Sequence, residues 1–144
     1  MALTIIASPT DVGRQRLAQQ LISGKSFIIN SFSVNSAGHD PGNPTLALTP
    51  DTSAVSCPGG APLYMAPIAS STLVSAFCPQ FECILPETAA VGSISNICLF
   101  GQVVYSPIPN DPDLGLVFLF GIGNFPLRVK TGADILNMLV SVQF

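Results

Sequence analysis

Charged side chains are scarce in this sequence. They make up 9% of its 144 residues, against about 25% in an ordinary globular domain, whereas 48% of the residues are apolar and the mean hydropathy is +0.54. A chain of this length forms one domain, which is too small to bury every apolar side chain in its own core. We therefore expect residues 1–144 to form a single domain whose apolar surface patches are covered by other proteins.

Basic residues are also few. The sequence has five Lys and Arg against eight Asp and Glu, which gives a net charge of -3. The cations, which form no long cluster, are Arg14, Arg16, Lys25, Arg128 and Lys130. Because contacts with phosphate groups supply most of the affinity of proteins for nucleic acids, we expect no DNA or RNA partner.

No continuous apolar run reaches the roughly 20 residues with which a helix crosses a bilayer. The charge-free stretches Thr52–Phe81 and Thr88–Asn110 are long enough, but proline interrupts the first, and glycine and polar residues interrupt the second. The N-terminal stretch Met1–Ala7 lacks a cationic start and ends at Ser8-Pro9, so it does not resemble a secretory signal. We therefore expect no membrane insertion, and synthesis in the cytosol.

The sequence also lacks the residue patterns of catalytic sites. Its single histidine, His39, lies beside Asp40 in a Gly/Pro-rich loop, where a solvated pair is expected in preference to a pH sensor or a lone metal ligand. The patterns GxSxG and GxxxxGK[ST] are absent. In Asp111-Pro112-Asp113 the proline should send the two carboxylates apart into water, and the neighbours do not supply the six or more oxygens that Ca²⁺ requires. We predict no enzyme, with no catalytic, cofactor-binding or metal-binding residues.

Four cysteines are present, and they leave two alternatives open. Cys98 lies inside the apolar run Ile97–Phe100 and is expected to be an ordinary buried thiol. For Cys57, Cys78 and Cys83, reduced thiols fit a cytosolic chain, whereas a disulfide among them fits a particle released into oxidising surroundings. The spacing of Cys78 and Cys83 would suit half of a zinc site, but the other half is missing, so no zinc is expected.

A helix is predicted between Thr10 and Gly24. Thr10 followed by Asp11 is a typical N-cap with an acidic first turn, and Gly24 stands where a helix would end. One face of this helix is apolar and consists of Gly13, Leu17, Ala18, Leu21 and Ile22. Arg14 points into the middle of that face, and we expect it to extend to water or to pair with a carboxylate at the start of the helix.

The rest of the sequence indicates β-strands separated by Pro, Gly and Asn. Strands are predicted at 27–34, 45–48, 71–77, 80–85, 94–105, 115–121, 127–129 and 135–142. In Leu116–Phe120 both alternating faces are apolar, which is typical of a central strand covered on each side. The predicted fold class is α+β, with one N-terminal helix packed on a mostly antiparallel, β-sandwich-like sheet.

Two parts of the sequence form a familiar combination of motifs. The first part consists of Thr10–Gly13, Leu17-Ala18, Leu21, Ser23-Gly24, Phe27–Ile29 and Phe32–Val34. The second part consists of Ile94–Gly101, Leu116–Gly121, Pro126-Leu127, Lys130 and Leu139–Phe144. Together they resemble the phage tail-collar fibre protein family, in its N-terminal attachment domain. The middle of the sequence, from about Thr49 to Phe77, has no counterpart in the resemblance.

The resemblance implies a bacteriophage virion structural protein: a tail, baseplate or collar component that is assembled in the host cytoplasm. Its implied partners are copies of itself, as a homo-oligomer, and other virion tail proteins. Because no fibre shaft follows before Phe144, we expect a fibre-attachment adaptor. The alternative is a carbohydrate- or receptor-binding module of a tail fibre, but the sequence has no Trp and only Tyr64 and Tyr105 to form an aromatic platform.

Overall fold

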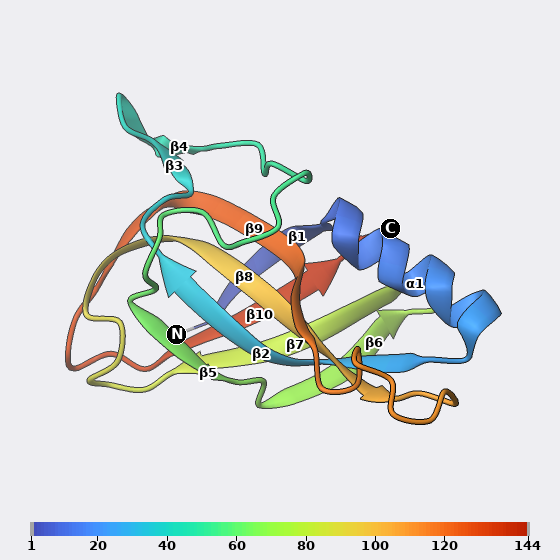
Figure 1. Cartoon of the computed structure of the whole chain (residues 1–144). Coiled ribbons are helices and arrows are strands. Elements are labelled where there is room, and N and C mark those ends of the chain that lie inside the picture. Colours follow the sequence, from blue (N-terminus) through green and yellow to red (C-terminus); the bar gives the residue numbers. More distant parts are fainter. Residues whose placement is uncertain (1, 144) are drawn as a thin grey trace.

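The computed structural model describes residues 2–143, which form one helix and ten strands (Figure 1). In chain order these are β1 (Ala2–Pro9), α1 (Asp11–Ser23), β2 (Ser26–Asn35), β3 (His39–Asp40), β4 (Asn43–Ala47), β5 (Tyr64–Pro67), β6 (Ser70–Ser75), β7 (Cys78–Leu85), β8 (Gly92–Tyr105), β9 (Val117–Lys130) and β10 (Leu136–Val142). Met1 and Phe144, at the ends of two segments discussed above, lie outside the described residues. The fold is mostly β with one helix, which agrees with the α+β prediction.

The helix begins and ends where its capping residues predict. The Thr10 side chain accepts a hydrogen bond from the Gly13 backbone N–H at 3.0 Å, and Gly24 ends the helix in the left-handed conformation with φ of 70°. The Thr10 hydroxyl also donates to the Leu119 carbonyl of β9 at 2.7 Å. This N-cap therefore fixes both the start of α1 and its position on the sheet.

The apolar face of the helix is only partly covered, contrary to the prediction. Gly13 is buried against β9, whereas Leu21 and Ile22 are 88% and 89% exposed. A Cβ atom on Gly13 would lie 2.6 Å from the Phe120 carbonyl oxygen, so the helix approaches the sheet closely there. Arg14 is exposed, and the described residues contain no ion pair of its side chain.

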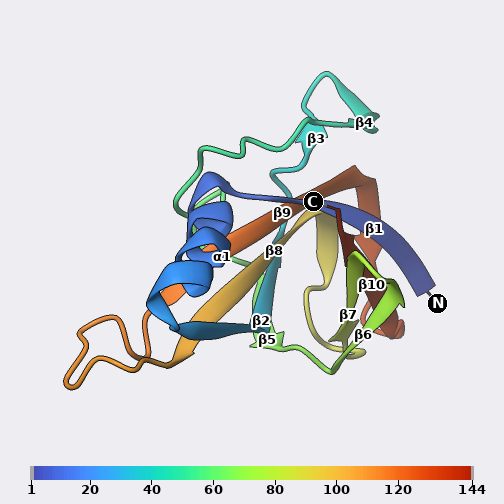
Figure 2. The ribbon, with the colours of Figure 1, turned by 90° about the vertical axis from the view of Figure 1, so that its right-hand side faces the viewer.

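Eight strands form a single sheet in the order β5-β2-β8-β9-β1-β10-β7-β6. Neighbouring strands are antiparallel except β1 and β10, which are parallel. The sheet curls at β1, because Ala2–Ala7 pair with β10 whereas Ser8 and Pro9 pair with β9 (Figure 2). The mostly antiparallel prediction is confirmed. Apart from the short β3-β4 pair, residues 2–143 form no second sheet that packs on this one, so a sandwich is not confirmed.

The two edges of the curled sheet are joined by two residues. Strands β5 and β6 lie at opposite ends of the strand order, yet only Ile68 and Ala69 separate them in sequence. The Ile68 N–H donates to the Asn30 carbonyl of β2 at 3.0 Å, and the Ala69 N–H donates to the Glu82 carbonyl of β7 at 2.9 Å. This corner brings the two halves of the sheet together around one core.

The core fills the inside of the curl and receives side chains from both halves of the sheet. Phe32 of β2 and Leu99 of β8 are register partners and are fully buried, as are Met138 and Val140 of β10. Gly123 leaves room between the halves, since a Cβ atom there would lie 2.8 Å from a methyl carbon of Ile5. In β9, Phe118, Leu119 and Phe120 are all buried, as the two-sided apolar pattern of Leu116–Phe120 predicts. The prediction is wrong for Leu116 and Val117, which are 40% and 55% exposed where the chain leaves the β8–β9 connection.

Candidate functional site

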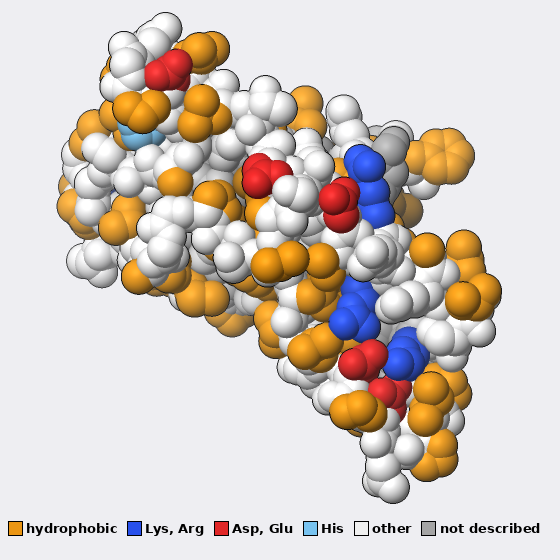
Figure 3. Space-filling model, turned by 45° about the horizontal axis from the view of Figure 1, so that its top comes forward, with side chains coloured by type: hydrophobic (Ala, Val, Ile, Leu, Met, Phe, Trp, Pro, Cys, Tyr) orange, Lys and Arg blue, Asp and Glu red, His pale blue; other side chains and the backbone are white. Residues whose placement is uncertain are grey.

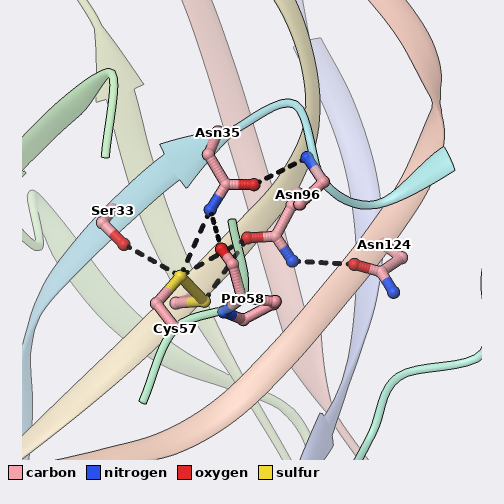
Figure 4. Close-up of a disulfide and its surroundings, with 8 residues drawn as sticks. Ser33, Asn35, Cys57, Pro58, Asn96 and Asn124 are labelled. Atoms are coloured by element: carbon pink, nitrogen blue, oxygen red, sulfur yellow. Dashed lines mark hydrogen bonds between the residues drawn. A yellow bond between two sulfur atoms is a disulfide. The ribbon is translucent and has the colours of Figure 1, made fainter. Parts of the chain in front are cut away.

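Three asparagines lie side by side on the outer face of the sheet. Asn35 of β2 is the register partner of Asn96 of β8, which in turn is the partner of Asn124 of β9. Asn96 is fully buried and donates to the Asn124 side-chain oxygen at 2.7 Å (Figure 4). Buried amides in proteins are almost always hydrogen-bonded, so this row requires partners above the sheet.

The partners come from residues 36–63, which connect β2 to β5 and include the β3–β4 hairpin; we call this segment the outer loop. Asn35 donates to the Pro58 carbonyl at 2.7 Å, and Asn124 donates to the Leu48 carbonyl at 3.0 Å. The asparagine side chains thus satisfy backbone groups of a segment that is largely irregular.

A disulfide between Cys57 and Cys98 ties the outer loop to β8, with Cα atoms 6.2 Å apart (Figure 4). The prediction that Cys98 is an ordinary buried thiol is therefore wrong. Its neighbours Ile97 and Leu99 face the core, so Cys98 faces outward, and it is buried only because the outer loop covers it. Asn35 donates to the Cys57 sulfur at 3.3 Å, which links the disulfide to the asparagine row.

Of the three cysteines in the predicted alternatives, only Cys57 is bonded. Cys78 and Cys83 are free thiols on the same strand, β7. They are separated by an odd number of positions and therefore face opposite sides of the sheet, which keeps them from bonding to each other. Cys83 faces the core, and its burial raises the pKa of its thiol to about 12.

His39 is not the solvated loop residue that its sequence context predicts. It is half-buried, and its Nδ1 lies 2.8 Å from the hydroxyl oxygen of Ser95. Ser95 is fully buried, and its hydroxyl oxygen also accepts a hydrogen bond from the Gly38 N–H at 2.9 Å. A Cβ atom on Gly38 would lie 2.0 Å from the Ser95 carbonyl oxygen, so glycine permits this contact. The His39–Ser95 pair holds the β3–β4 hairpin on β8.

The acidic pair is also arranged differently from the prediction. The carboxylates of Asp111 and Asp113 do not diverge: both bind the Lys25 ammonium, at 2.8 and 3.0 Å. Arg16 lies 3.3 Å from Asp113 and 5.5 Å from the centre of the Phe118 ring. The two carboxylates converge because the Asp111 carboxylate also accepts a hydrogen bond from the Asp113 N–H at 3.0 Å. This bond folds the chain back around the proline.

Hydrogen bonding in this cluster shifts the acidity of its members. The hydrogen bond from Lys25 lowers the pKa of Asp111 to about 2, with help from Ser106. The same ammonium lowers the pKa of Asp113, and Asp111 in return raises the pKa of Lys25. The cluster joins the start of β2 to residues 106–116, which we call the β8–β9 loop. It therefore fixes a loop that projects from the sheet (Figure 2).

Apolar side chains are exposed on the projecting parts that these anchors support (Figure 3). In and beside the β8–β9 loop they are Val104, Tyr105, Ile108, Leu114, Leu116 and Val117. In the outer loop they are Leu46, Leu48, Val55 and Leu63. A third group lies at the β6–β7 tip, which comprises residues 73–79. There Leu73 and Phe77 are 67% and 85% exposed and, with Ala76 and Pro79, line a hollow of about 400 Å³.

The rest of the described chain holds scattered metal-ligand side chains, one short helix and two tyrosines. Within residues 2–143, no three His, Cys, Asp or Glu side chains gather in one place. The single helix of this part of the chain is too short to cross a bilayer. Of the two tyrosines, Tyr64 is half-buried against Phe32, with ring centres 6.3 Å apart, and Tyr105 is 56% exposed. The arrangement is that of anchored loops presenting apolar surface.

Sequence reasoning missed the asparagine row and the partner of Cys57. The available signal was the alternation in β8, where a cysteine faces outward between two core residues and follows a polar Ser95-Asn96 pair. Outward residues that are buried indicate a covering segment, but the sequence does not say which one.

Comparison with models of protein families, with curated proteins and with solved structures found no match to this chain.

Proposed function

We propose that this chain is a structural subunit that acts by protein–protein assembly, and that it is a bacteriophage tail, baseplate or collar component or a fibre-attachment adaptor. One observation carries the assembly proposal: large apolar side chains are exposed on three separate projections of a chain in which 9% of the residues are charged. The phage assignment rests on the sequence resemblance alone.

The anchors described above suit such a role. The disulfide, the asparagine row and the Lys25 cluster hold two of the three projections to the sheet, so little conformational freedom would be lost when a partner binds. The exposed residues are neutral, so their burial at an interface carries no cost of removing charges from water.

The fold is compatible with the collar-domain resemblance. The half β5-β2-β8-β9 and the half β1-β10-β7-β6 enclose one core, with α1 against β9. We infer that the curled sheet is a sandwich whose two layers are continuous through β1. The Thr10-x-x-Gly13 pattern, which belongs to the resemblance, begins the helix of this chain and packs it against β9 through Gly13.

Sedimentation velocity over a range of concentrations tests the assembly proposal. We expect the fraction of the protein that is oligomeric to increase with concentration. A protein that is still monomeric at the highest concentration would contradict assembly. The phage assignment has a separate test, the genes beside the coding sequence. Sheath, baseplate or fibre genes would support it, and a metabolic operon would remove it.

A further inference from the structure

The two edge strands of the curled sheet differ in how well they are protected. Proteins usually protect an edge with a short strand, proline, charge or a bulge, because an open edge pairs with other strands. Strand β5 has four residues and ends in Pro67. Strand β6, Ser70–Ser75, has six residues, all exposed, without proline or charge. Its one irregularity is a register shift near its end, between Leu73 and Ser75.

We propose that β6 pairs in antiparallel fashion with β6 of a second copy of this chain, about a two-fold axis, and so joins two curled sheets edge to edge. This inference rests on the proposed assembly function and names the surface and the partner. Backbone groups on the outer side of β6 would then form the hydrogen bonds that an edge strand otherwise leaves to water.

The charge distribution favours a second copy as the occupant. At a two-fold axis each residue meets the same residue of the other copy or a close neighbour of it, so a charged edge would repel itself. Strand β6 lies inside the charge-free stretch Thr52–Phe81, and its Ser, Thr, Leu and Val side chains can face their own copies without repulsion. Because the edge is neutral, it also has no charge that would favour a charged partner over a second copy.

The position of Leu73 supports the same contact. Ser71 is the register partner of the buried Phe81, so Ser71 and Leu73 both belong to the core face of the sheet, yet Leu73 is 67% exposed. An axis perpendicular to the sheet keeps both core faces on the same side and makes one residue face its own copy, and placing Leu73 opposite Leu73 gives nearly full overlap of the two β6 strands. The two Leu73 side chains then lie beside each other and bury the apolar wall of the hollow.

A charge placed on this edge tests the proposal. Leu73→Lys puts two ammonium groups close to the axis, and we expect the dimer dissociation constant to rise at least about tenfold in sedimentation equilibrium. The matched control is Leu21→Lys in α1, another exposed leucine, which lies outside the three projections on a helix that packs against β9, and this variant should dimerise like the wild type. Thermal unfolding of each variant checks that the fold is retained.

The possible results distinguish the β6 proposal from the more general assembly proposal. If Leu73→Lys dimerises as tightly as the wild type, the β6 proposal is wrong while assembly through another surface stands. If the wild type is a monomer at every concentration, both fail. Hydrogen exchange on the wild type gives a second measurement that needs no variant. Amides of Ser70–Ser75 should exchange more slowly as concentration rises, and slowing confined to another segment would place the contact there.

Discussion

Cys57 and Cys98, which are 41 positions apart in the sequence, are joined by a disulfide that holds the outer loop on strand β8. Removing this bond should lower the free energy of unfolding by about 2–4 kcal/mol, since a closed loop of this length restricts the unfolded chain. The measurement is urea unfolding of the double variant Cys57→Ser, Cys98→Ser against the wild type. Cys78→Ser, which removes a free thiol, is the control and should leave the midpoint nearly unchanged.

Reduction of the wild type gives an independent check of the same bond. Limited proteolysis with a reductant present should produce new cuts within residues 49–61, because the covalent tie of this segment to the sheet is then lost. An identical pattern with and without reductant would show that the asparagine row alone is sufficient to hold the loop.

The Lys25 cluster predicts a change in stability at acid pH. Its hydrogen bonds lower the pKa of Asp111 to about 2 in the folded chain, below the ordinary value of 3.8. A lowered pKa contributes stability above pH 4, which is lost as the pH falls from about 4 to 2. Urea midpoints of wild type and Asp111→Asn should therefore differ at pH 5 and converge near pH 2. Equal midpoints of the two proteins at pH 5 would show that the cluster adds no stability.

Gly13 of α1 is predicted to tolerate no side chain, although alanine favours helices. A Cβ atom at this position meets the Phe120 carbonyl oxygen at 2.6 Å, so the helix would have to move away from β9. We expect Gly13→Ala to lower the free energy of unfolding by about 1–3 kcal/mol in thermal or urea unfolding. Gln15→Ala, on the exposed side of the same helix, should change it little. Equal stability of Gly13→Ala and the wild type would contradict this packing.

Asn96 is expected to be the most sensitive member of the asparagine row. It is fully buried, and Asn96→Ala removes the donor to the Asn124 side-chain oxygen, leaving a polar atom without its partner. The expected loss is about 1–3 kcal/mol in the free energy of unfolding. Asn43→Ala in the exposed β4 strand is the control. A loss at Asn96 no larger than that at Asn43 would mean that the row does not stabilise the fold.

Local features of this fold could be predicted from the sequence, and distant pairings could not. The caps Thr10 and Gly24 act within one helical turn, so their pattern is sufficient to place α1. Strand β1, Ala2–Pro9, was not predicted, because its parallel partner is β10 at the other end of the described chain. Strand β9 was predicted as two pieces, because Gly121 and Gly123 usually interrupt strands. Here they make room for β1, which crosses them.

The same distinction applies to the candidate site. The apolar, charge-poor composition predicts exposed apolar surface, and the structure places it on three projections. The contacts that hold two of them, Cys57 with Cys98 and Lys25 with Asp111 and Asp113, each join residues far apart in sequence. No local pattern specifies such a pair, since the partner is selected by the topology of the sheet.

The position of β10 between β1 and β7 also determines when the sheet can form during synthesis of the chain. Strand β1 leaves the ribosome long before its main partner, residues 137–142, which lies far downstream of it in the chain. The inner face of the curl therefore cannot be covered while the chain is still being translated. Folding must wait for the closing of one very long loop, and such distant pairings fold slowly. During that interval the apolar strands of the newly made chain remain uncovered.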